Sequence, residues 1–179
     1  MTNIEILDRS PDWRRLQETF DRLSRVVPRF RQRVILPSVP TTEPRWVVDP
    51  DFDLSYHLRR TRLQEPGTMR QLLDTVEVFA ASPLDVARPL WTTYLIEGLE
   101  GGRAAVVSHV SHVITDGVGG VSMAEQMYDL ERDGADRRMP PLPTPGELAP
   151  NDLAVAGLKE VPGRTIGYAR GITASALSA

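Results

Sequence analysis

The sequence predicts an α/β (α+β) layered fold. Two segments, 13–27 and 68–80, carry apolar residues at helical spacing, and a proline follows each of them. Two short apolar runs, 91–96 and 104–110, are joined by a glycine-rich turn that is typical of a β-hairpin. Helices and strands that alternate in this way build layered domains.

The first element is a strand at residues 4–7, and an amphipathic helix follows it. Ser10 is a favourable N-cap for this helix, Pro11 suits the first helical position, and Asp12 complements the helix dipole. Pro28 ends the pattern. The expected apolar face consists of Trp13, Leu16, Phe20, Leu23 and Val27.

The later elements give the order β, α, β, β, α, β, β, α, without an internal repeat. Short strands are predicted at 33–36 and 46–48, before the helix 68–80 and the hairpin. Thr115 or Asp116 is expected to cap a third helix over 118–130. The order predicts an α+β or open-faced α/β domain.

The expected domain organisation is one lobe over 1–136, a linker over 137–162, and the start of a further helix over 163–179. The chain of 179 residues suffices for one ordinary domain. Five prolines between positions 140 and 150 predict an extended linker.

Composition excludes several classes of protein. A net charge of −3 argues against nucleic acid as a partner, and the absence of cysteine excludes disulfides and thiolate metal sites. We expect a cytoplasmic protein, because the sequence has no stretch of about 20 apolar residues and no secretory signal. Contact with lipid would then be peripheral. Eight arginines in the first 33 residues could attract anionic lipid or phosphate, but the solvated face of one helix is the favoured interpretation.

His112 is the residue in this chain best suited to general base catalysis. It follows a predicted strand at the turn into a helix, where a side chain is held rigidly at the rim of a sheet. Histidine has an ordinary pKa of about 6.5, so it can accept a proton near neutral pH. Asp116 can cap the helix or hold the loop, and Gly117 permits a turn that a Cβ would hinder. By spacing alone, a structural histidine is favoured over a catalytic one.

A metal site is the alternative for the same residues. His109, His112 and Asp116 could supply three ligands. Residues three apart on one strand point to opposite faces, so His109 and His112 could share an ion only if the strand ended before Ser111. We therefore expect no metal.

Several segments resemble the bacterial wax ester synthase/diacylglycerol acyltransferase family. Residues 107–120 resemble the motif His-His-x-x-x-Asp-Gly of the CoA-dependent acyltransferase superfamily. The run Pro89, Leu90, Trp91 resembles the Pro-Leu-Trp strand of the family. The segments 27–33 and 46–53, followed by Tyr56 and His57, also resemble it. These pieces cover about residues 3 to 130 in the family's order, and they count against the peptide-synthetase condensation branch.

The resemblance implies a role for each motif residue. His112 matches the second motif histidine, which deprotonates the acceptor hydroxyl. Asp116 matches the motif aspartate, a structural support, and Gly117 matches the motif glycine in the loop. Ser111 stands where the first histidine is expected, so one supporting side chain is absent. Core packing is expected for Pro89, Leu90 and Trp91, and a role in folding is expected for His57.

The resemblance also implies a fold and a function. The fold is one lobe of a chloramphenicol acetyltransferase-like two-layer sandwich, a mixed sheet with helices on one face. The function is transfer of a long-chain acyl group from acyl-CoA, a co-substrate, to diacylglycerol or a long-chain alcohol, without a cofactor. Family members have two lobes, so a second acyltransferase lobe is an expected partner, at a membrane or lipid-droplet surface. The alternative is an inactive fragment or a lipid- or acyl-CoA-binding module.

Overall fold

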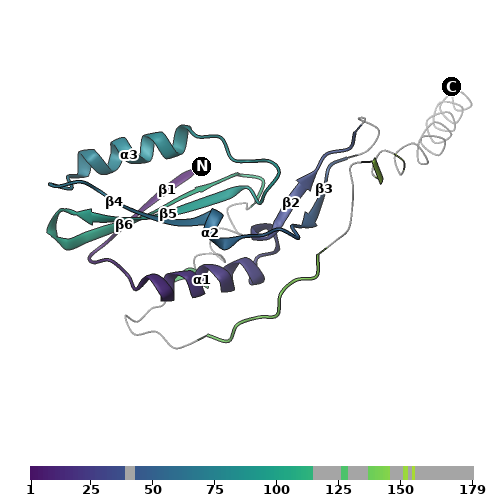
Figure 1. Ribbon diagram of the computed structural model, residues 1–179, viewed down its shortest axis with the longest axis horizontal. Coiled ribbons are helices and arrows are strands. Elements are labelled where there is room, and N and C mark those ends of the chain that lie inside the picture. The colour runs from purple at the N-terminus through teal and green to yellow at the C-terminus, as the bar shows by residue number, and fades with distance from the viewer. Residues whose placement is uncertain (39–42, 115–125, 129–136, 146–150, 153–154, 156–179) are drawn as a thin grey trace, which may run out of the picture. The chain divides into compact units, whose positions relative to one another are not determined.

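A computed structural model describes residues 1–38, 43–114, 126–128, 137–145, 151–152 and 155 (Figure 1). The chain divides into two compact units, Met1–Arg33 with Val48–Pro145 and Val34–Val47 with Gly146–Ala179. The elements are β1 (Thr2–Leu7), α1 (Trp13–Val26), η1 (Pro28–Phe30), β2 (Gln32–Ile35), β3 (Arg45–Val48), α2 (Leu54–His57), β4 (Leu58–Arg62), α3 (Met69–Ala81), β5 (Trp91–Leu99), η2 (Glu100–Gly102) and β6 (Arg103–Val110).

The first unit is built on a four-stranded mixed sheet. Its strand order is β1-β6-β5-β4, and β2 and β3 pair separately in a two-stranded sheet. β6 pairs antiparallel with β1 and β5, whereas β4 pairs parallel with β5. The expected α/β class, the mixed sheet and the hairpin are thereby confirmed.

Helices cover both faces of this sheet, so the expectation of helices on one face is wrong. Figure 1 shows α3 and α1 on opposite sides of the sheet. On one face, Leu95 and Val106 pack against α1. On the other, Ile96 and Val107 pack against α3. Because neighbouring residues on β5 and β6 point to opposite faces, an unbroken apolar run must be covered on both sides.

The first helix begins two residues later than expected. Asp12, not Ser10, is its N-cap, and the Asp12 carboxylate accepts the Arg15 backbone N–H at 2.8 Å. The Ser10 hydroxyl instead donates to Glu97 at 2.6 Å. A carboxylate at the N-cap also complements the helix dipole, which favours the observed start at Trp13.

Part of the arginine-rich segment is directed inward, which the expectation of a solvated face missed. Arg14 fits that expectation, because its ion pair with Glu18 is exposed. Asp21, however, pairs with Arg25 at 2.7 Å and with Arg31 at 2.6 Å. These two arginines therefore have internal partners in the described part of the chain.

The second predicted helix, α3, starts at a capping box. The Thr68 side chain accepts from the Gln71 backbone N–H, and the Gln71 side chain accepts from the Thr68 backbone. Gly67, just before it, has φ +69°, and a Cβ there would lie 1.9 Å from the Gly98 oxygen. Close backbone contact therefore requires glycine at this position.

Among the helices that the structure describes, none combines the length and the apolarity needed to cross a bilayer.

Candidate active site

His112 lies on a turn directly after the central strand β6. Val110 is the last residue of β6 and is buried. The Ser111 N–H then donates to the Leu90 oxygen at 3.0 Å, and the Ile114 N–H donates to the Ser111 oxygen at 3.1 Å. His112 itself is exposed. The predicted position at the rim of the sheet is thus observed.

The turn is fixed because its far end is buried. Ile114 is only 6% exposed and packs in a core with Phe20, Leu23 and Trp91. Met127, beyond the undescribed residues 115–125, packs against the same core. An imidazole on a turn held at both ends can accept a proton without reorganisation of the backbone.

The other predicted site residues, Asp116 and Gly117, lie outside the described residues, as does most of the predicted helix 118–130. Ser111 is half-buried, and its hydroxyl lies 3.5 Å from the Val113 nitrogen, at the limit of a hydrogen bond. The roles of Asp116 and Gly117 therefore stay predictions.

His109 lies on the strand itself, on the face that α3 covers. Its Nδ1 is 2.8 Å from the Thr2 hydroxyl. Burial, together with the nearby N-terminal ammonium, lowers the pKa of His109. No group of three metal-ligating side chains occurs among the described residues, which do not include Asp116.

The Pro-Leu-Trp segment packs in the core, as expected. Trp91 is fully buried and stacks with Phe20 at a centroid distance of 5.9 Å. Its ring lies 4.7 Å from that of Phe30, and its indole N–H donates to the Phe30 oxygen at 2.9 Å. Trp91 is paired with Val110 in the sheet. This core therefore supports the end of β6 from which the motif emerges.

His57 is a buried histidine beside Trp91. It has no exposed surface, and its Nδ1 donates to the Trp91 oxygen at 2.7 Å. Burial, which disfavours the charged imidazolium, lowers the pKa of His57. Its Nε2 has no hydrogen-bond partner among the described residues. His57 thus belongs to the packed interior, as its expected role in folding requires.

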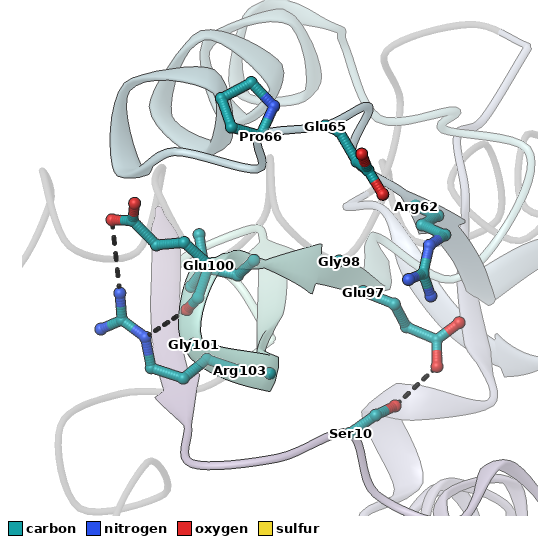
Figure 2. A pocket seen from close by; sticks show the side chains of 11 residues that line it. Ser10, Arg62, Glu65, Pro66, Glu97, Gly98, Glu100, Gly101 and Arg103 are labelled. Atoms are coloured by element: carbon teal, nitrogen blue, oxygen red, sulfur yellow. Dashed lines mark hydrogen bonds and ion pairs between the residues drawn. The ribbon is translucent and has the colours of Figure 1, made fainter.

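A hollow of about 470 Å³ lies at the opposite end of the sheet (Figure 2). Its lining includes the hairpin tip with Gly101 and Arg103, and Ser10 donates to Glu97 at its edge. β6 starts at Arg103 and runs away from this hollow to Val110. Its seven steps of about 3.3 Å span about 23 Å, so the hollow and the motif turn lie at opposite ends of this strand.

The sequence of this chain matches a known family of proteins. Residues 2–179 match the family model described as the wax ester synthase/diacylglycerol acyltransferase catalytic domain. The chain belongs to this family. A Mycobacterium tuberculosis family member named as a diacylglycerol O-acyltransferase is 53% identical over 164 residues, which cover 92% of this chain and 33% of that protein. Another from the same organism with the same activity in its name is 36% identical, covering 90% of this chain and 35% of that protein.

Two solved structures also resemble this fold. The enzyme from Marinobacter aquaeolei VT8 matches with a TM-score of 0.61 and 31% identity, over 78% of this chain and 35% of that one. The first condensation domain of the calcium-dependent antibiotic synthetase matches with a TM-score of 0.58, over 70% of this chain and 30% of that one. At 19% identity, this second likeness shows the fold alone. The chain spans about a third of the length of the curated relatives it matches.

Proposed function

We propose that this chain carries the general base of an O-acyltransferase. The proposed reaction transfers a long-chain acyl group from acyl-CoA to diacylglycerol or a long-chain alcohol. The observation that carries the proposal is the exposed His112, held on a turn that packs into the core through Ile114. Membership of the wax ester synthase/diacylglycerol acyltransferase family supports the reaction class.

In the proposed mechanism, a neutral His112 removes the proton from the acceptor hydroxyl. The oxygen attacks the thioester carbonyl as the O–H bond breaks, and the tetrahedral intermediate collapses with loss of the CoA thiolate. The proton held by the imidazolium then passes to the departing sulfur. An ester and free CoA result, and the histidine is again neutral. No cofactor takes part in these proposed reaction steps.

The proposal includes a second lobe that completes the binding site. A general base contributes about 10²- to 10⁴-fold to the rate, and the positioning of two substrates must supply the rest. The curated relatives are about three times as long as the matched region. We assign the second lobe to the region by which they extend beyond it. Both acceptors are lipids, so the proposal also includes peripheral contact with a membrane or lipid inclusion.

A catalytically inactive acyl-CoA- or lipid-binding module is the second candidate. Ser111 favours it, because this residue stands where the motif of the superfamily has its first histidine. Such a module would bind acyl-CoA, and its binding would not depend on His112 acting as a base.

The test is an acyl-CoA transfer assay with diacylglycerol and with a long-chain alcohol as acceptors. It is run with and without the second lobe of the 53% identical relative. We expect His112→Ala to lower kcat by about 10²- to 10⁴-fold. His109→Ala, which removes the nearby histidine on β6, serves as the control and should retain activity. Full activity of the His112→Ala protein would refute the assignment of the base, and acyl-CoA binding without any transfer would favour the inactive module.

A further inference from the structure

Two successive carbonyl groups link the motif turn to the buried His57. The Leu90 oxygen accepts the Ser111 N–H at 3.0 Å. The next carbonyl, that of Trp91, accepts the His57 Nδ1–H at 2.7 Å. One short segment is thus hydrogen-bonded to the motif by one carbonyl and to His57 by the other. A shift of this segment would change the position of Ser111, the residue before His112.

His57 is itself held in one orientation. Its ring is stacked with Phe52 at 5.1 Å and 11°, and with Trp91 at 4.7 Å and 20°. A carbonyl oxygen can only accept, so Nδ1 carries the hydrogen in this contact. In the neutral imidazole Nε2 is then unprotonated, and it has no donor among the described residues. His57 therefore presents one fixed donor to the Trp91 carbonyl.

We infer that His57 is a positioning residue for the motif turn, acting on His112 through the segment Leu90–Trp91. This inference rests on the proposed function only where it concerns catalysis. The structural part of the inference is the effect of the His57 hydrogen bond on the Ser111 amide, and it can be measured without any acyl transfer.

Two substitutions separate the donor from the ring. His57→Phe keeps an aromatic ring between Phe52 and Trp91 but places a C–H where Nδ1 was. A C–H···O contact needs about 3.3 to 3.6 Å, so the Trp91 carbonyl must move by roughly 0.6 Å or more from its 2.7 Å contact. His57→Asn loses the ring but places an N–H donor on the same branch of the side chain. Val76→Ala, in the core on the α3 face, is a control for general destabilisation.

The first readout is hydrogen exchange at the Ser111 amide, compared with the amide of Val107 within β6. We expect His57→Phe to speed exchange at Ser111 by roughly fivefold to tenfold relative to Val107. His57→Asn and Val76→Ala should leave this ratio unchanged, even where both amides exchange faster. An unchanged ratio in His57→Phe would overturn the inference, as would an equal rise in Val76→Ala. If His57→Asn fails to fold, the comparison of the other two variants still decides.

The second readout is the imidazole NMR signal of His112. The chain has only three histidines, so assignment by substitution is direct. His57→Phe should shift the His112 signal, and Val76→Ala should not. In the transfer assay, His57→Phe should lower kcat while the KM for acyl-CoA stays unchanged, and His57→Asn should restore kcat. If His112→Ala keeps full activity while His57→Phe still changes the exchange ratio, the proposed base is refuted. The positioning role of His57 is then still supported.

Discussion

Replacement of Trp91 by phenylalanine tests whether the core beneath β6 stabilises the fold. Trp91 is fully buried and packs against Phe20, Phe30 and His57. Phenylalanine keeps one aromatic ring in this cluster. It removes the indole N–H, so the Phe30 oxygen loses the donor that lies at 2.9 Å.

The expected cost combines two effects. A buried carbonyl that loses its donor costs about 1 to 3 kcal/mol. The smaller ring buries roughly 40 Å² less apolar surface, which at about 25 cal/mol per Å² adds about 1 kcal/mol. We therefore expect Trp91→Phe to lower the free energy of unfolding by about 2 to 4 kcal/mol.

The assay is denaturant unfolding followed by circular dichroism. Trp13→Phe is the matched control, because Trp13 is half-buried at the start of α1 and should cost less than about 1 kcal/mol. If the two variants differ by less than about 0.5 kcal/mol, the interpretation of Trp91 as the centre of this core is wrong.

The remaining predictions concern backbone geometry and pH. Gly67→Ala should cost more than about 3 kcal/mol in thermal or denaturant unfolding, because its Cβ would lie 1.9 Å from a backbone oxygen. Gly102→Ala, with φ +74° and open space around its Cβ, should cost only about 1 to 2 kcal/mol, and equal losses would contradict the steric argument. Burial lowers the pKa of His57, so the unfolded chain binds its proton more readily than the fold does. Stability should therefore be full above about pH 6.5 and fall below it, and His57→Phe should weaken this dependence in pH-resolved melts. The contribution of His109, whose pKa is also lowered, should remain. An unchanged curve would show that His57 does not contribute.

The sequence predicted the elements whose apolar pattern is strong. The helices over 13–27 and 68–80 and the hairpin are observed close to their expected bounds. It missed β4, because only Leu58 and the half-buried Thr61 of Leu58–Arg62 are directed away from solvent. This strand exists because it pairs in parallel with β5, a contact that lies far along the chain. Local pattern cannot reveal such a partner.

The candidate site was predicted in part. The spacing placed His112 after a strand, and the structure places it there. The position of His57 against the Trp91 carbonyl could not be predicted, because it depends on how two distant segments meet. The contact of His57 with Trp91 follows from packing in three dimensions. Motif spacing describes only neighbours along the chain.

The two-sided burial of β6 has a consequence for its tolerance of mutation. Ala104 to Val107 are four successive residues with at most 5% of their surface exposed. A saturation mutagenesis scan should therefore find no alternation of tolerant and intolerant sites along this stretch, and each position should reject charged residues. Few substitutions in the strand that leads to His112 are therefore expected to be neutral. The nearest site for an inserted label is the hairpin tip at Gly101 and Gly102.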